Sequence, residues 1–318
     1  MGIRRRRHLG YPLRGSGWPI LLAAALVLAT ACGGESANLT SVTGSASSPT
    51  AAPPRPSPVA SSSAAATPSP MSQPTPEPIS GEVVVFAAAS LADAFEEIAR
   101  QFEAEHPSVK VTFNFAGSSV LRTQLGLGAK ADVFASADEK NMRGAQEDGT
   151  IAGEPQVFVR NRPVVVVPAS NPAGIAEFKD LARAGVRLVL EAKDVPIGNY
   201  TRQILAKASE DPSYGADFAD RVLANVVSEE TNVKAALTKV VLGEADATFV
   251  YVSDVTPDMR DKVRIVEVPD EFNVVAEYFI APVKAAPNPA AGRAFIDFVL
   301  SPQGQAILEK WGFSPVER

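Results

Sequence analysis

The feature that most constrains this chain is a short apolar strand that runs through small residues into a helix. Residues 82–86, Glu-Val-Val-Val-Phe, are typical of a strand buried on both faces in a parallel sheet. Three alanines lead to Ser90, after which apolar residues recur at helical spacing as far as Phe102. We expect Ser90 to be the helix N-cap, with Asp93 completing the start signal. Ser90 could do no more than cap the helix, but the small residues before it would also let an anion approach the helix N-terminus.

The same arrangement recurs further along the chain. Residues 109–115 alternate as a strand and lead through Gly117 to Ser118 and Ser119, where a second helix is expected to begin. Residues 131–136 indicate a third strand, and Asp138 is expected to cap a helix that reaches about residue 148. This succession predicts a parallel sheet whose ligand crevice lies at the carboxyl ends of the strands. Ser90 and Ser118 are expected to face that crevice.

The first 80 residues lack the composition of a folded domain. A basic block at residues 4–7 and an apolar run that ends at Ala31 indicate a secretory signal, too short to span a bilayer as a stable helix. We expect residues 1–31 to be a signal peptide of the lipoprotein type. Residues 28–32, Leu-Ala-Thr-Ala-Cys, resemble a bacterial lipobox, in which Cys32, the only cysteine, would be lipidated. Residues 33–80, rich in Ser, Thr, Ala and Pro, are expected to form a disordered tether to the membrane.

The remainder of the chain is acidic. Of the 30 Lys and Arg residues 24 lie beyond residue 80, together with 34 of the 36 Asp and Glu residues, so this part has a net charge of about −10. No basic patch stands out, which argues against nucleic acid as a partner. The overall field would also repel an anion. An anion site in this chain must therefore rely on local dipoles in a closed pocket.

The second half of the chain predicts another α/β unit that interrupts the first. The apolar runs between residues 157 and 167 are split by Arg160 to Pro163, which we interpret as the connection into a second lobe. Strands are expected near residues 186–190, 226–227, 245–251 and 263–268. Helices are expected to begin near residues 201, 217 and 233. A strand at 274–280 could return to the first lobe, before helices at 288–300 and 302–311. The expected bounds are 81–165 and 269–318 for lobe 1 and 166–268 for lobe 2, joined by a hinge.

Six short motifs in this order resemble the molybdate-binding proteins of bacterial ABC importers. They are Phe-Ala-Ala-Ala-Ser-Leu at 86–91, Phe-Ala-Gly-Ser-Ser at 115–119, Ala-Asp-Val-Phe-Ala-Ser-Ala-Asp at 131–138, Val-Pro-Ile-Gly-Asn-Tyr at 195–200, Asn-Val at 232–233 and Val-Tyr at 250–251. The similarity runs through residues 82–313. It implies an α/β fold of the two-lobed periplasmic-binding-protein type (type II), which closes on a tetrahedral oxyanion about a hinge.

The resemblance also implies a set of uncharged ligands for the oxyanion. The implied donors are the hydroxyls and amides of Ser90 and Ser118, the backbone amides of Ile197 and Val233, and the phenol of Tyr251. Ser119 is the alternative to Ser118. From the residues alone, Tyr251 could equally be a half-buried strand tyrosine, and Val233 could be a core valine.

Two positions depart from the family pattern. Ile197 stands where alanine is usual, so its side chain could narrow the cleft while its backbone amide keeps its role. Gly117 stands where another small polar residue is common, and this departure puts nothing essential about the resemblance in doubt.

None of the implied ligands is a carboxylate. A fully deprotonated dianion offers only acceptors and suits an all-donor shell, whereas phosphate keeps a proton near neutral pH and benefits from an acceptor. Molybdate, tungstate and sulfate fit this requirement. The resemblance favours molybdate, with tungstate nearly the same size and another oxyanion such as sulfate as the alternative.

An enzyme is the competing class of protein. His8 lies in the leader and His106 precedes Pro107, and the sequence has no serine-hydrolase elbow, P-loop or metal-spaced His/Cys cluster. We therefore expect no catalytic residues, no cofactor and no direct metal-ion ligands. A sensory domain of the same fold is a third possibility, against which the export signal argues. The expected protein is a monomeric, lipid-anchored, extracytoplasmic receptor that delivers molybdate or tungstate to an ABC permease and its ATPase.

Overall fold

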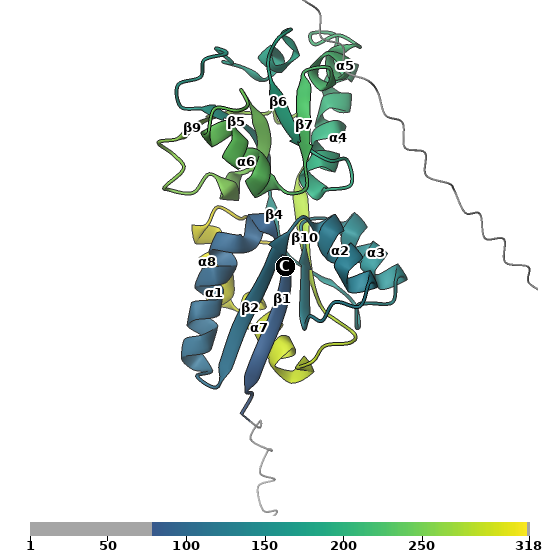
Figure 1. Ribbon diagram of the computed structural model, residues 1–318, viewed down its shortest axis with the longest axis vertical. Coiled ribbons are helices and arrows are strands. Elements are labelled where there is room, and N and C mark those ends of the chain that lie inside the picture. The colour runs from purple at the N-terminus through teal and green to yellow at the C-terminus, as the bar shows by residue number, and fades with distance from the viewer. Residues whose placement is uncertain (1–77, 317–318) are drawn as a thin grey trace, which may run out of the picture. The chain divides into compact units, whose positions relative to one another are not determined.

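The computed structural model describes residues 78–316. The expected signal peptide, the lipidation site Cys32 and nearly all of the tether lie outside the described residues. In the part that is described, the chain builds two α/β lobes, and the first is made from both ends of this part (Figure 1). An α/β fold in two lobes is therefore confirmed.

The first lobe has a five-stranded mixed sheet. Its strands, in spatial order, are β2 (Val109–Ala116), β1 (Gly81–Ala88), β3 (Val133–Ser136), β10 (Ala276–Pro282) and β4 (Gln156–Asn161). β1 pairs in parallel with β2 and β3, as the strand–helix alternation predicts. The returning strand β10 is antiparallel to both of its neighbours. The carboxyl ends of β1 and β2 consequently meet at one edge of the sheet.

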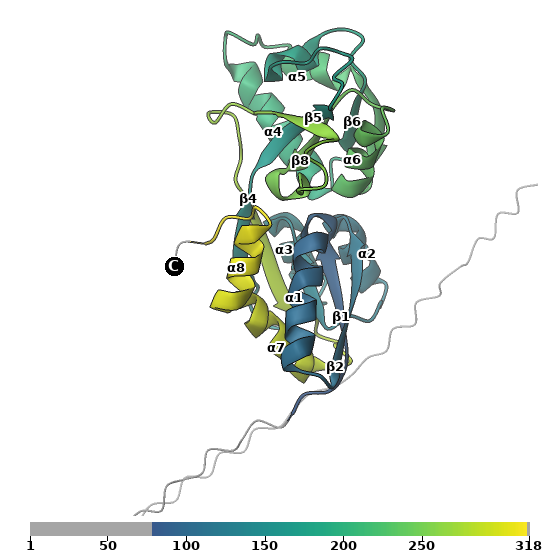
Figure 2. The same ribbon diagram turned by 90° about the vertical axis from the view of Figure 1, so that its left-hand side faces the viewer.

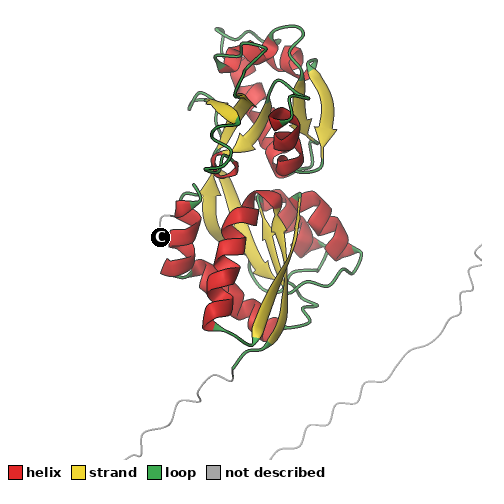
Figure 3. Cartoon of the chain, turned by 60° about the vertical axis from the view of Figure 1, so that its left-hand side comes forward, coloured by secondary structure: helices red, strands yellow, loops and turns green. Residues whose placement is uncertain are grey.

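Helices cover both faces of this sheet (Figures 2 and 3). They are α1 (Ala92–Glu105), α2 (Ser118–Gly126), α3 (Glu139–Glu147), α7 (Pro289–Leu300) and α8 (Pro302–Lys310). Side chains of β1 point alternately to the two faces of the sheet, and each face packs against a different layer of helices. Val83 and Val85 belong to the hydrophobic cluster that includes Phe95 of α1 and Phe295 of α7. Phe86 belongs to a second cluster with residues of α2 and α3. Each face of the strand is therefore buried, as its run of apolar residues predicts.

The second lobe contains two smaller sheets. One has the order β8 (Thr248–Tyr251), β5 (Pro163–Pro168), β9 (Val263–Val266), with antiparallel pairing. The other pairs β6 (Leu188–Glu191) in parallel with β7 (Val226–Glu230), and a bridge between Leu188 and Ala247 links the two. The helices α4 (Pro196–Glu210) and α6 (Val233–Val241) pack on these strands, and α5 (Phe218–Leu223) packs on α4.

The chain crosses between the lobes twice. The first crossing lies between Asn161, the last residue of β4, and Pro163, the first of β5. Residues 163–165, which we had assigned to lobe 1, pair with β8 and β9 in the second lobe. Their buried valine side chains make them part of that core, so the crossing coincides with the Arg160–Pro163 interruption instead. The second crossing lies between β9 and β10, and Phe272, which we had assigned to lobe 1, packs against Tyr214 of the second lobe.

Two helix starts differ from their predictions. The chain makes a 3-10 turn, η1 (Ala89–Leu91), before α1 begins at Ala92, so Ser90 is not the N-cap of α1 and makes no capping bond. Its hydroxyl instead lies 2.8 Å from that of Tyr278. Helix α4 begins at Pro196 rather than near residue 201, since a proline is well tolerated in the first turn of a helix. Within residues 78–316, no helix is both long and apolar enough to cross a membrane.

Candidate anion-binding site

The five predicted donors line one small cavity between the lobes. Ser90 and Ser118 come from the first lobe, and Ile197, Val233 and Tyr251 come from the second. The cavity is small, with a volume of about 20 Å³. The other residues on its wall are small or uncharged, among them Ala88, Ala137 and Asn232 of the two lobes. The structure therefore gathers residues separated by up to half of the chain around one point.

Ser118 rather than Ser119 faces this cavity. Ser118 is the first residue of α2, and its buried Oγ accepts a hydrogen bond of 3.0 Å from the backbone N–H of Ala137. With that lone pair used, its hydroxyl proton is free to be donated. Its backbone N–H lies in the first helical turn, where no intrahelical acceptor exists. Ser119 does not line the cavity and lies in a different surface hollow, beside Arg122.

The second lobe contributes two more helix N-termini. Ile197 is the second residue of α4, whose first intrahelical bond runs from Asn199 N to Val195 O. Val233 is the first residue of α6, where Asn232 acts as the N-cap and its Oδ1 accepts from Ala235 N at 3.0 Å. The N–H groups of Ile197 and Val233 are thus among those that a helix leaves without an internal acceptor. The N-termini of α2, α4 and α6 together give the cavity a positive partial charge.

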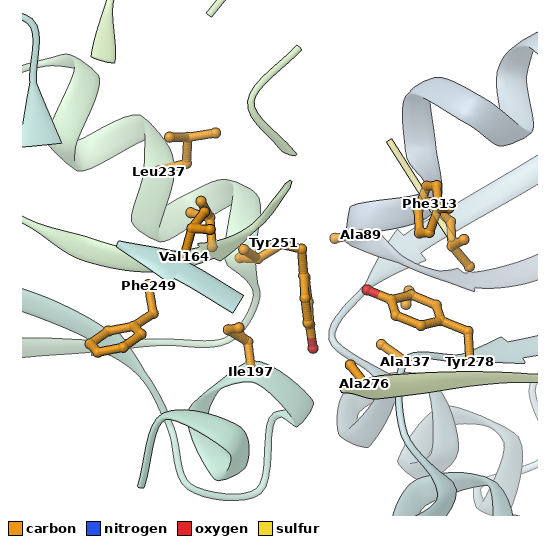
Figure 4. Close-up of a cluster of buried hydrophobic side chains, with 14 of the residues drawn as sticks. Ala89, Ala137, Val164, Ile197, Leu237, Phe249, Tyr251, Ala276, Tyr278 and Phe313 are labelled. Atoms are coloured by element: carbon orange, nitrogen blue, oxygen red, sulfur yellow. The ribbon is translucent and has the colours of Figure 1, made fainter. Parts of the chain in front are cut away.

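Tyr251 supplies a buried hydroxyl that has no hydrogen-bond partner anywhere in residues 78–316. It ends β8, its side chain is 1% exposed, and it lies at the centre of the contact between the lobes (Figure 4). Burial raises the pKa of the Tyr251 phenol well above its ordinary value, so the hydroxyl keeps its proton and remains a donor. An unpaired buried hydroxyl costs about 1–3 kcal/mol. An acceptor held in the cavity would relieve this cost.

Charged side chains lie close to the cavity without lining it. Lys234 follows Val233, and its Nζ is 2.7 Å from Asp93 of the first lobe and 3.4 Å from Asp254 of the second. Asp138 follows Ala137, and its carboxylate caps α3 by accepting from Asn141 N at 3.0 Å. These charged groups therefore bind partners outside the cavity, and the cavity wall itself presents uncharged donors.

The lobes approach each other closely beside the cavity. A Cβ atom built on Gly117 would lie 2.2 Å from the backbone oxygen of Thr231 in the other lobe. Two weak hydrogen bonds of 3.4 Å also join the lobes here. Asn141 Nδ2 donates to the backbone carbonyl oxygen of Asp194, and the Tyr200 hydroxyl donates to that of Ala137. A side chain at position 117 would therefore require the backbone at Thr231 in the other lobe to shift.

Two lobes that close over a small cavity of uncharged donors define a solute-binding protein. Residues 83–314 match the family model for bacterial extracellular solute-binding proteins. The chain belongs to this family, which confirms the fold and family expected from the six motifs. Its members are binding proteins of transport systems rather than enzymes.

Several known proteins are similar over the described part of the chain. The molybdate-binding protein ModA of Mycobacterium tuberculosis is 44% identical over 232 residues, which cover 73% of this chain and 84% of that protein. The molybdate-binding protein ModA of Escherichia coli is 32% identical over 241 residues, covering 74% and 89%. Among solved structures, the substrate binding domain of a putative molybdenum ABC transporter from Clostridium difficile is 30% identical. It superimposes with a TM-score of 0.54 and covers 74% of this chain and 99% of that one.

Proposed function

We propose that this protein captures molybdate in the cavity between its lobes and delivers it to the permease of an ABC transporter. The observation that carries the proposal is the set of donors on the cavity wall. The residues that line the cavity offer two serine hydroxyls, helix N-terminal amides and the unpaired phenol of Tyr251, and none of them has a charged side chain. The names of the relatives support the choice of molybdate among the oxyanions that such a shell would accept.

The chemistry of the shell favours a fully deprotonated dianion. Each oxygen of such an ion only accepts hydrogen bonds, and every group proposed to bind it donates. Phosphate carries a proton near neutral pH and would be bound better by a site with a carboxylate acceptor, which the cavity wall does not offer. Tungstate resembles molybdate in size and charge, so we expect it to bind in the same way. Sulfate is smaller and would leave some donors at longer distances.

Binding is expected to stabilise the closed arrangement of the lobes. Ser90 and Ser118 lie on one side of the cavity and Ile197, Val233 and Tyr251 on the other, so one anion would bridge them. Within residues 78–316 the backbone crosses between the lobes at two places, which suits a hinge motion. An anion that contacts both lobes binds the closed form better than the open one and shifts the population towards it.

The proposed protein is a monomeric receptor that works outside the cytoplasm without a cofactor. The leader and Cys32 are proposed to anchor it to the membrane as a lipoprotein, with residues 33–80 as the tether. The anchor would keep the receptor near its permease, where the ATPase supplies the energy for transport.

Calorimetric titration of the purified protein with molybdate, tungstate, sulfate and phosphate tests this proposal. We expect molybdate and tungstate to bind with similar affinity, sulfate more weakly and phosphate most weakly. Tighter binding of phosphate than of molybdate, or no binding of molybdate, would contradict it.

A further inference from the structure

Tyr278 lies behind the cavity and contacts donors from both lobes. It belongs to β10 and its side chain is fully buried. Its hydroxyl is 2.8 Å from Ser90 Oγ, and its ring meets that of Tyr251 edge-on at a centroid distance of 5.7 Å (Figure 4). Tyr278 is not among the residues that line the cavity. Tyr278 therefore contacts two of the proposed anion ligands, Ser90 and Tyr251, from outside the cavity.

The position of the Tyr278 ring is fixed by its surroundings. Besides Tyr251, the rings of Phe158 and Phe313 pack edge-on against it, at centroid distances of 6.4 and 5.5 Å. The register between β10 and β4 shifts between Tyr278 and Phe279. Such an irregularity changes the direction of a strand side chain locally. The hydroxyl is thus held at one place by packing on several sides.

The hydrogen bond between Tyr278 and Ser90 requires one of the two hydroxyls to donate. Tyr278 has one proton, and a buried O–H group without an acceptor is strongly disfavoured. Ser90 Oγ is the hydrogen-bonding partner at 2.8 Å. Within residues 78–316, Ser90 Oγ is the partner that lies within hydrogen-bonding distance of the phenol oxygen, so we take Tyr278 to donate its proton to Ser90.

Once Ser90 accepts from Tyr278, its own proton is left for another acceptor. The cavity is the place where Ser90 can find one, since Ser90 lines its wall. A hydroxyl that accepts one hydrogen bond also becomes a better donor in the next, because the bonds polarise each other.

We propose that Tyr278 is a positioning residue that turns the Ser90 hydroxyl towards the bound oxyanion and strengthens it as a donor. This inference rests on the proposed function of the cavity. Removing the Tyr278 hydroxyl would leave every anion contact in place but would allow the Ser90 proton to turn away. The effect on affinity should therefore depend on the presence of Ser90.

A double-mutant cycle measured by calorimetry with molybdate tests this dependence. The variants are Tyr278→Phe, Ser90→Ala and the double variant, all in the full-length protein. We expect Tyr278→Phe alone to raise the Kd about fivefold to twentyfold, and to change it less than about twofold when Ser90 is already alanine. Tyr214→Phe is the matched control, since Tyr214 lies among Phe178, Phe218 and Phe272 of the second lobe. It should leave the Kd unchanged.

The outcomes separate this inference from the proposed function. If Ser90→Ala leaves the Kd unchanged, the proposed site is wrong and the role of Tyr278 falls with it. If Ser90→Ala weakens binding but Tyr278→Phe does not, or the two effects simply add, the site stands and the positioning role is refuted.

A fluorotyrosine at position 278 provides a second variant that keeps the shape of the ring. Fluorine makes the phenol a stronger donor, so molybdate should bind more tightly than to the natural protein. An unchanged or higher Kd would contradict the inference.

Discussion

Replacing Gly117 with alanine should block closure of the lobes while leaving each lobe intact. The backbone at Gly117 has φ −63° and ψ 141°, an extended conformation that alanine adopts without strain. The added methyl group would instead lie 2.2 Å from the backbone oxygen of Thr231. An ordinary contact requires about 3.4 Å. The lobes would therefore have to separate by about 1 Å at this point.

A separation of this size is large compared with the tolerance of a hydrogen bond. N–H···O distances lie within about 2.7–3.2 Å, so an anion held by the first lobe would lose good contact with the donors of the second. Hydrogen bonds to charged groups contribute about 1.5–3 kcal/mol each. Losing two of the three second-lobe donors, Ile197, Val233 and Tyr251, would cost about 3 kcal/mol or more, which is at least about 100-fold in Kd.

Gly126→Ala is the matched control for this experiment. Gly126 ends the same helix, α2, and a Cβ built there has no neighbour within 4 Å. Calorimetry with molybdate should show weak binding for Gly117→Ala and natural affinity for Gly126→Ala. Small-angle scattering should show contraction on adding molybdate for the control only. A Gly117→Ala variant that binds and contracts like the natural protein would refute the reasoning.

Three further predictions concern the site and its surroundings. Ser90→Ala or Ser118→Ala should weaken molybdate binding by about 1–3 kcal/mol in calorimetry, since each leaves a charged acceptor unpaired, and unchanged affinity in both would remove these residues from the site. Asp93→Asn breaks the 2.7 Å ion pair with Lys234 across the lobes. Because both side chains are partly exposed, we expect the Kd for molybdate to rise only about twofold to fivefold, and by less at high salt. An effect that does not depend on salt would argue against an ion pair. Burial raises the pKa of Glu191 well above its ordinary 4.5, so between the ordinary pKa and the raised native-state pKa the native state holds a proton that the unfolded state has lost. Over that pH range the free energy of unfolding should fall by about 1.4 kcal/mol per pH unit. Glu191→Gln should lack this decline in thermal melts, and parallel pH profiles for both proteins would show that Glu191 is not protonated.

The fold could be predicted well from local patterns. Buried strands such as residues 82–86 and the helix after Asp138 follow from apolar runs and capping signals, which act between near neighbours. The N-cap assignment of Ser90 was wrong because its hydroxyl lies against Tyr278, 188 positions away. A capping signal in the sequence does not reveal such a competitor. The start of lobe 2 was placed at residue 166 rather than 163, because the valines at 164–167 suit the core of either lobe.

The candidate site was predictable only in part, for a related physical reason. The resemblance supplied Ile197, Val233 and Tyr251, which on their own residue types could be core residues. Tyr278 carries no signal in the sequence, because it has the spacing of an ordinary strand aromatic. Gly117 likewise gave no indication that Thr231 would lie against it. Both roles depend on contacts between distant parts of the chain.

The central claim is that uncharged donors from both lobes hold the oxyanion. A crystal structure of the protein with molybdate tests it most directly. The account predicts molybdate in the cavity, with its oxygens within hydrogen-bonding distance of the hydroxyls of Ser90, Ser118 and Tyr251 and of the backbone amides of Ile197 and Val233. Molybdate bound elsewhere, or held mainly by lysine and arginine side chains, would contradict it.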